Sequence, residues 1–218
     1  MNQNPKVSIL VPVYGVEKFI ERCAISLFEQ TFEDIEYVFV NDCTPDKSID
    51  ILKEVLEKYP DRKAQVKIIN HEVNKGLAGA RNTGVENANG DYILHVDSDD
   101  YLEVNAIELL YKKAISDNAD IVVCDYIFEW SNYKEIFNIN VGDDNVKFIQ
   151  CILSSKLMIG VVNKLIRKTL YTENNIKAIE GINLGEDLMT IPKLIYYSKK
   201  VFKLNSALYH YSQINPNS

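Results

Sequence analysis

The chain has 218 residues and a formal net charge of −7, and 46% of its residues are hydrophobic. This apolar fraction is that of a folded globular protein and excludes an intrinsically disordered chain. The negative charge argues against a protein that binds nucleic acid without sequence preference, because such proteins carry a basic stripe. A single large domain accounts for this length.

The sequence shows no sign of a membrane span or a disulfide framework. No run approaches the roughly 20 apolar residues that cross a bilayer, and the first residues lack the charged and apolar regions of a signal peptide. Four cysteines are widely spaced and form no Cys-x-x-Cys pair: Cys23, Cys43, Cys124 and Cys151. We therefore expect reduced, mostly buried thiols in a cytoplasmic protein. The polar residues 213–218 follow a patterned segment abruptly, which suggests a truncated chain.

Strand and helix patterns alternate over the first part of the chain. Runs rich in β-branched and aromatic residues predict strands at 7–13, 35–40, 66–69, 92–96 and 120–128. Apolar residues at the 3.6-residue period predict helices at 16–28, 49–59, 77–88 and 103–117. Asp46 or Ser48 can cap the second helix. The alternation predicts an α/β fold with a Rossmann-like, mostly parallel sheet flanked by helices.

After Trp130, predicted strands and helices no longer alternate regularly. Strands are predicted at 133–139, 201–204 and 207–211, and helices at 143–153 and 185–197. Pro192 should kink the last helix or mark its beginning. We expect this smaller second part to pack on the first.

Polar residues end three of the predicted strands. Right-handed crossovers between parallel strands place Tyr14, Asp42 and Asp97 along one edge of the sheet. Ligands of open α/β sheets bind at this edge. The expected site therefore combines Asp42 with the acidic residues that begin at Asp97.

The segment Asp-Ser-Asp-Asp at 97–100 is the most informative motif. Three carboxylates at a strand end repel one another and lose hydration, and a divalent cation such as Mg²⁺ or Mn²⁺ is the usual compensation. A metal ion that only a few carboxylates bind is usually also coordinated by phosphate oxygens. The motif therefore predicts a metal beside a phosphate-bearing substrate.

Calcium-binding, phosphatase and purely structural roles fit the acidic segment less well. A calcium-binding EF-hand loop starting at Asp97 fails where Tyr101 and Leu102 replace an oxygen ligand and a glycine. An aspartyl-phosphate phosphatase signature fails at Tyr101. A helix cap by Asp99 or Asp100 leaves the other two carboxylates unexplained. Neither a Gly-x-Gly-x-x-Gly after the first strand nor a P-loop occurs, so dinucleotide and P-loop sites lose their main support.

Four segments occur in the order and spacing of family 2 glycosyltransferases. They are Val-Ser-Ile-Leu-Val-Pro-Val-Tyr at 7–14, Val-Asn-Asp at 40–42, Asn-Lys-Gly-Leu-Ala-Gly-Ala-Arg-Asn at 74–82, and the acidic segment at 97–100. The chain resembles this family over essentially its whole length, most specifically up to residue 125. Asn-Lys-Leu-Ile-Arg at 163–167 and Gly-Glu-Asp-Leu at 185–188 give shorter support. The resemblance implies the GT-A fold and a nucleotide-diphosphate sugar as donor.

The resemblance also implies roles for individual residues. The nucleotide-sugar site would comprise Pro12, Tyr14, Asp42, Lys75, Arg81, Asp97 and Ser98. Asp42 resembles the residue that pairs with the base, and its carboxylate suits the uracil ring N–H, which favours a UDP-sugar. Asp99 looks like the metal ligand and Asp187 like the general base. Further candidates are Asp100, Lys164, Glu186 and His210.

Each of these roles has a plainer alternative. Arg81 could be a surface helix charge, and Glu186 with Asp187 could be the acidic first turn that a helix dipole favours. Lys164 could touch the diphosphate or the acceptor, or be solvated at a helix end. His210 could add a metal ligand, although a hydrogen-bonded structural histidine is the better interpretation.

We expect an inverting, metal-dependent glycosyltransferase made of one domain, 1–218. Residues 1–125 would bind the nucleotide sugar and residues 126–218 the acceptor, a glycan or lipid-linked hydroxyl in bacterial surface polysaccharide or glycolipid synthesis. Membrane contact would be peripheral at most, at the inner face of the cell membrane. The rivals are a nucleotidyltransferase, which would carry a basic Gly-rich loop after the first strand, and a non-catalytic nucleotide-sugar-binding domain.

Overall fold

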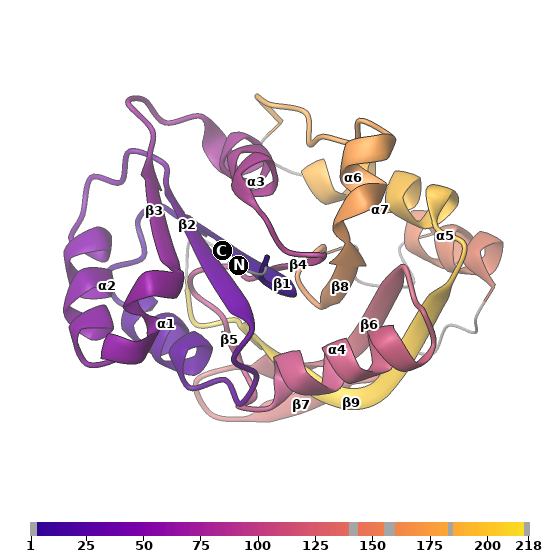
Figure 1. Cartoon of the computed structure of the whole chain (residues 1–218), viewed down its shortest axis with the longest axis horizontal. Coiled ribbons are helices and arrows are strands. Elements are labelled where there is room, and N and C mark those ends of the chain that lie inside the picture. Colours follow the sequence, from indigo (N-terminus) through magenta and orange to yellow (C-terminus); the bar gives the residue numbers. More distant parts are fainter. Residues whose placement is uncertain (1–3, 140–143, 155–159, 183–184, 216–218) are drawn as a thin grey trace.

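One mixed sheet runs through the molecule (Figure 1). The computed structural model describes residues 4–139, 144–154, 160–182 and 185–215. Within these ranges the strand order is β3-β2-β1-β4-β8-β6-β9-β5, and β7 pairs with β6 off this path. The strands are β1 Val7–Val13, β2 Ile35–Asn41, β3 Val66–Asn70, β4 Tyr92–His95, β5 Tyr101–Leu102, β6 Ile121–Glu129, β7 Lys134–Phe137, β8 Lys164–Arg167 and β9 Val201–Ser212.

Helices cover the sheet on different sides. Figure 1 shows α3, α6 and α7 above the central strands, α4 below β6, and α1 and α2 at the end of the sheet that holds β3. The helices are α1 Ile20–Phe28, α2 Ser48–Glu57, α3 Gly76–Asn87, α4 Ala106–Ser116, α5 Asn145–Leu153, α6 Lys168–Glu173 and α7 Glu186–Tyr197, with a 3₁₀ helix at Pro60–Gln65. The predicted α/β architecture is confirmed.

The N-terminal strands are parallel because a helical crossover separates each pair. β1 pairs with both β2 and β4, and β2 pairs with β3, all in parallel. Val13 lies beside Asn41, and Leu10 lies beside His95. This register brings the residues that follow β1, β2 and β4 to one edge, as the strand ends predicted.

The C-terminal part completes the sheet mainly with antiparallel pairs. β8 lies antiparallel between β4 and β6, whereas β9 runs parallel to β6. The two predicted closing strands are one strand, β9. The pairing of β9 with β6 shifts register beside Asp125. Such a bulge lets a strand continue past an irregular residue, so the gap predicted between the two closing strands does not interrupt β9.

Several predicted elements have different boundaries, and the helix expected at 16–28 begins only at Ile20. The helix expected from residue 103 begins at Ala106, because Tyr101 and Leu102 pair with the end of β9. The strand expected at 133–139 is limited to β7, and residue 143 of a predicted helix lies outside the described residues. Pro192 lies inside α7 and does not mark its beginning. The N-cap of α2 is Lys47, so the prediction of a cap by Asp46 or Ser48 is wrong, although Asp46 accepts a hydrogen bond from the N–H of Ser48, the first residue of the helix.

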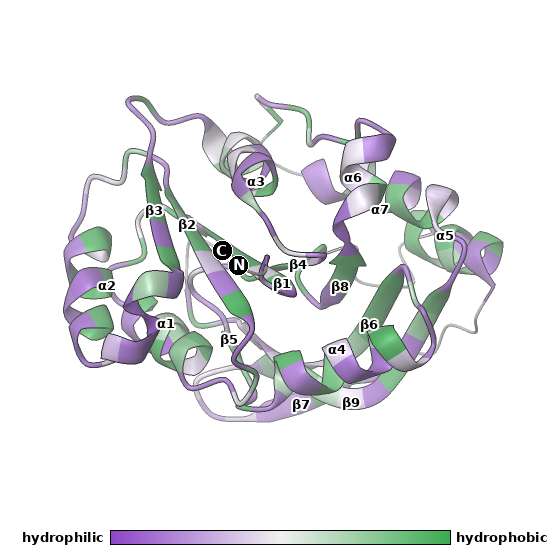
Figure 2. Ribbon diagram, in the orientation of Figure 1, coloured by the Kyte–Doolittle hydropathy of each residue, from purple (hydrophilic) through white to green (hydrophobic). Residues whose placement is uncertain are grey.

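Apolar residues fill the space between the sheet and its helices. Figure 2 shows green and purple bands alternating around α2 and α4, whose apolar faces turn inward. All four cysteines are free thiols; Cys23 and Cys124 are buried, whereas Cys43 is exposed and Cys151 is half-buried. The expectation of mostly buried thiols therefore holds for two of them. None of the described helices is long and apolar enough to cross a membrane.

Candidate active site

A cleft of about 640 Å³ opens where β1, β2 and β4 end. Pro12 and Tyr14 line it from β1, and Tyr14 is 52% exposed. Ser98 and Asp99 line it after β4, and Asp187 lines it from the first turn of α7. The structure thus gathers residues from both halves of the chain around one cavity.

Asp42 organises the loop that leads into α3. Its buried carboxylate accepts hydrogen bonds from the backbone N–H groups of Lys75 and Gly76, both at 2.8 Å, and its Oδ1 lies 2.7 Å from His71 Nδ1. A carboxylate offers about four acceptor sites, so one further donor can be accommodated. Asp42 lines the cleft, and its contact with a base stays a prediction.

Glycines let α3 approach β1 closely. A Cβ at Gly84 would lie 3.3 Å from the Leu10 side chain, and one at Gly79 would lie 2.6 Å from Lys75 Cβ. Gly76 has φ +77°, which suits a glycine at the start of the helix. Close packing of α3 carries Arg81 beneath the wall of the cleft, where it is 6% exposed. The interpretation of Arg81 as a surface helix charge is therefore wrong.

Arg81 lies among three carboxylates. Its Nη1 donates to Glu186 Oε1 at 2.8 Å and to Asp187 Oδ1 at 2.5 Å, and its Nη2 donates to Asp97 Oδ1 at 3.1 Å. Burial opposes the charged guanidinium, but the three carboxylates outweigh it and raise the pKa of Arg81. One positive charge therefore holds three acids together at the junction of α3, α7 and the end of β4.

Asp187 has the surroundings of a general base. Burial raises its pKa to about 6, while Arg81 opposes this shift. Its Oδ2 accepts a hydrogen bond from the Val161 N–H at 3.0 Å, and Oδ1 is the atom bound by Arg81. A carboxylate with this pKa is ionised at neutral pH and is still basic enough to take a proton.

The three carboxylates of the acidic segment at 97–100 have different partners. Asp97 pairs with Arg81. Asp100 accepts hydrogen bonds from Tyr209 Oη at 2.6 Å and from the Ser212 N–H at 2.7 Å, and burial raises its pKa well above the usual range. Protein groups therefore compensate Asp97 and Asp100, a contribution that the repulsion argument for a cation left out.

Asp99 is the carboxylate that fits a metal. It is 9% exposed, lines the cleft and forms no ion pair within the described part of the chain. Its Oδ2 accepts a hydrogen bond from Asn215 at 2.8 Å, and burial raises its pKa. No group of three or more His, Cys, Asp or Glu in the described ranges forms a metal site. One carboxylate with substrate phosphates is nevertheless a common set of ligands for Mg²⁺.

Three further candidates do not line the cleft: Lys75, Lys164 and His210. His210 is stacked on Tyr101 with ring centroids 4.0 Å apart, and its Nε2 lies 2.8 Å from Glu103 Oε1. Lys164 is buried in β8, so it is not a solvated lysine. Lys75 is exposed and contributes its backbone N–H to Asp42.

Several partners could not be found from the sequence alone. Val161 acts through its backbone N–H, which any residue other than proline supplies. Tyr209 and Ser212 lie in a segment whose pattern indicates only a strand, and they meet Asp100 across 109 and 112 residues of sequence. Asn215 lies in the polar segment at the end of the chain, and no sequence motif indicates its contact with Asp99.

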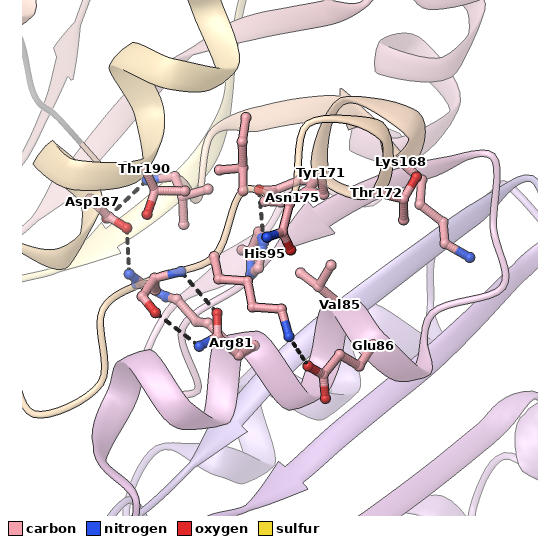
Figure 3. A pocket seen from close by; sticks show the side chains of 15 residues that line it. Arg81, Val85, Glu86, His95, Lys168, Tyr171, Thr172, Asn175, Asp187 and Thr190 are labelled. Atoms are coloured by element: carbon pink, nitrogen blue, oxygen red, sulfur yellow. Dashed lines mark hydrogen bonds and ion pairs between the residues drawn. The ribbon is translucent and has the colours of Figure 1, made fainter. Parts of the chain in front are cut away.

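A second cavity of about 230 Å³ lies on another side of Arg81 and Asp187. Figure 3 shows Asp187 directed toward Arg81, with His95 and Tyr171 deeper in this cavity. His95 Nε2 lies 3.2 Å from Tyr171 Oη, and burial lowers the pKa of His95 to about 3, which keeps it neutral. Polar residues such as Glu86 and Thr190 and apolar residues such as Val85 and Ile176 line this cavity together.

Comparison with known proteins agrees with the geometry. Residues 8–168 match the family described as glycosyl transferase family 2. The chain is 35% identical to "Uncharacterized glycosyltransferase EpsJ" of Bacillus subtilis, over 98% of this chain and 62% of that protein. It is 32% identical to a poly(ribitol-phosphate) beta-glucosyltransferase of Bacillus spizizenii, over 90% of this chain and 30% of that protein. It thus spans less than two thirds of either relative's length.

The fold has a close solved counterpart. The crystal structure of S. aureus TarS 1-349 in complex with UDP-GlcNAc superposes with a TM-score of 0.82 at 23% identity. The superposition covers 96% of this chain and 59% of that chain. The likeness shows that the fold is GT-A.

Proposed function

Because the chain belongs to glycosyl transferase family 2, we propose that it transfers a sugar from a nucleotide diphosphate to an acceptor hydroxyl. The observation that carries this proposal is the meeting of Asp99 and Asp187 on one cleft at the carboxyl ends of the strands. Two carboxylates there have different environments, which suits different tasks. Asp99 would face the diphosphate, and Asp187 would face the acceptor hydroxyl.

The residues of the chain divide the chemistry as follows. Pro12, Tyr14 and Asp42 border the part of the cleft that would hold the nucleotide, and the lone pair that Asp42 retains can accept a uracil N–H. Asp187 takes the proton of the acceptor hydroxyl as the new bond forms, and its ionised state at neutral pH supports this role. Attack from the face opposite the diphosphate inverts the anomeric centre.

A divalent cation would be held by Asp99 together with phosphate oxygens, and it would neutralise the charge of the departing diphosphate. Arg81 is committed to the three carboxylates and thereby places Asp97 and Asp187 beside the donor. We propose this indirect task for Arg81, in addition to any contact with the nucleotide.

The relatives support the proposed donor and setting. TarS has been crystallised with UDP-GlcNAc, which favours a UDP-sugar for this chain. The poly(ribitol-phosphate) relative supports an acceptor in bacterial cell-surface polymer synthesis. The proposed division of labour is that residues 1–125 bind the donor and residues 126–218 face the acceptor. Action at the inner face of the membrane, by peripheral contact, belongs to the same proposal.

Isothermal titration calorimetry with UDP tests the donor site. We expect UDP to bind more tightly with Mn²⁺ than without it, and Asp99→Ala to remove most of that metal-dependent gain. Asp61→Ala, an exposed change on the 3₁₀ helix, serves as the matched control. Equal UDP affinity with and without Mn²⁺ would contradict the metal site. Binding without hydrolysis or transfer of any UDP-sugar would favour a non-catalytic domain.

A further inference from the structure

A fully buried lysine lies next to the wall of the cleft. Lys164, the first residue of β8, is 1% exposed. Burial lowers the pKa of Lys164 to about 8, so the ammonium group is still charged at neutral pH. A buried charge is strongly destabilising unless hydrogen bonds compensate it. The contacts of Lys164 therefore need an explanation beyond the filling of space.

The ammonium group binds one particular peptide. Lys164 Nζ donates to the Gly160 carbonyl oxygen at 2.5 Å. The peptide unit that contains this oxygen also contains the N–H of Val161, and that N–H donates to Asp187 Oδ2 at 3.0 Å. Because a peptide unit is planar, fixing its oxygen also fixes the direction of its N–H. The positive charge polarises the unit as well, which strengthens the N–H as a donor.

The ammonium group is itself anchored to the sheet. Lys164 Nζ also donates to Asn163 Oδ1 at 2.6 Å, and Asn163 Nδ2 donates to the Cys124 carbonyl oxygen of β6 at 2.5 Å. Asn163 is fully buried. A continuous line of hydrogen bonds therefore runs from β6 through Asn163, Lys164 and one peptide to Asp187.

We infer that Lys164 is a positioning residue that orients the general base Asp187 through the peptide between Gly160 and Val161. The inference rests on the proposed function, in which Asp187 takes the acceptor proton. If Lys164 had only a packing role, an apolar side chain of similar length could replace it without a change in catalysis.

The charges around Asp187 set the direction of the expected effect. Asp187 faces Arg81 from α3, Glu186 from its own helix and Asp97 from the end of β4. A hydrogen bond from Val161 favours the ionised carboxylate, and the charge of Lys164 acts in the same direction. Loss of this hydrogen bond should therefore raise the pKa of Asp187 and leave less ionised base at neutral pH.

The first test is Lys164→Met in the whole chain, with Lys200→Met as the matched control. Lys200 also donates to a backbone carbonyl, that of Asp117, and it lines neither of the two cavities. We expect Lys164→Met to lower kcat at pH 7 by about tenfold or more and to move the acid limb of the pH–rate profile upward. UDP affinity should stay within about twofold, and the control should keep the profile of the parent chain. An unchanged kcat and acid limb in folded Lys164→Met would overturn the inference.

A second pair of variants tests the peptide without removing the lysine. A Cβ at Gly160 would lie 3.1 Å from Tyr126 Oη, a buried hydroxyl with no hydrogen-bond partner in the described part of the chain. Gly160→Ala should displace the peptide and reproduce the shifted acid limb, and adding Tyr126→Phe should restore it by making room. These variants test the inference even if Lys164→Met does not fold. An acid limb in Gly160→Ala at the same pH as in the parent chain would contradict the inference. Absence of any transfer by the parent chain would instead contradict the proposed function.

Discussion

At the scale of single residues, neighbouring carboxylates have different partners. Asp97, Asp99 and Asp100 lie within four residues of sequence, yet Asp97 pairs with Arg81, Asp99 accepts a hydrogen bond from Asn215 and Asp100 binds Tyr209. Asp187 differs from all three because it combines a contact with Arg81 at Oδ1 with a backbone donor, the Val161 N–H, at Oδ2. Residue type alone could not separate these tasks.

Replacing Asp187 by Asn should abolish transfer but keep donor binding. The amide cannot accept the acceptor proton, so kcat should fall by about 10²–10⁴-fold. Single-turnover transfer and UDP titration measure the two properties separately. Asp144→Asn is a suitable control, because this residue only caps α5. Transfer at the parent rate would exclude Asp187 as the base.

The same residue predicts a pH dependence. As the proposed base, Asp187 would have to be ionised, and burial raises its pKa to about 6. Activity should therefore be low below that pH and rise as the pH passes through it. A profile of kcat/KM against pH reports the free enzyme. A flat profile between pH 5 and 7, with the chain shown to be folded, would contradict this assignment.

At the scale of elements, the position of α3 depends on the glycines that allow it to touch β1. Gly84 lies against Leu10, and the same helix carries Arg81 to the three carboxylates. The local sequence predicted a helix here, but its interior glycines gave no amphipathic stripe to show which face is buried. The approach to Leu10 explains why small residues stand where a helix would otherwise favour larger ones.

Gly84→Val should therefore weaken both stability and the site. The added side chain overpacks the contact with Leu10, and we expect a loss of about 1–3 kcal/mol in the free energy of unfolding. The displaced helix should also weaken UDP binding, because Arg81 moves with it. Urea unfolding and calorimetry measure the two effects. Lys53→Val, on an exposed position of α2, should change neither, and an unchanged stability of Gly84→Val would contradict the packing argument.

At the scale of the whole molecule, the sheet joins the two halves that the sequence distinguished. β8 pairs with β4 on one side and with β6 on the other. The fold class and the strand-end edge were predictable, because periodicity and strand ends are local properties of the chain. The partners of Asp187, Asp99 and Asp100 were not, because they arise from contacts between distant segments such as Arg81 and Asp187, 106 residues apart.

The shared sheet predicts cooperative unfolding. Trp130, the one tryptophan, follows β6 in the second half, whereas far-UV circular dichroism reports on all helices and strands. Both probes should give the same urea midpoint, because neither half has a sheet of its own. Separate midpoints would show that the halves unfold independently. Added UDP with Mn²⁺ should raise the common midpoint, since a ligand of the folded state stabilises it.

The late position of β9 has a consequence for biosynthesis. Tyr209 and Ser212 hold Asp100, and Asn215 holds Asp99, although both aspartates are translated about a hundred residues earlier. A ribosome that has made only the first two thirds of this chain has therefore produced every strand-end acid without the groups that donate hydrogen bonds to Asp100. Such nascent chains carry an acidic loop without its hydrogen-bond donors, and the loop can take the arrangement of the folded chain only once translation has supplied β9.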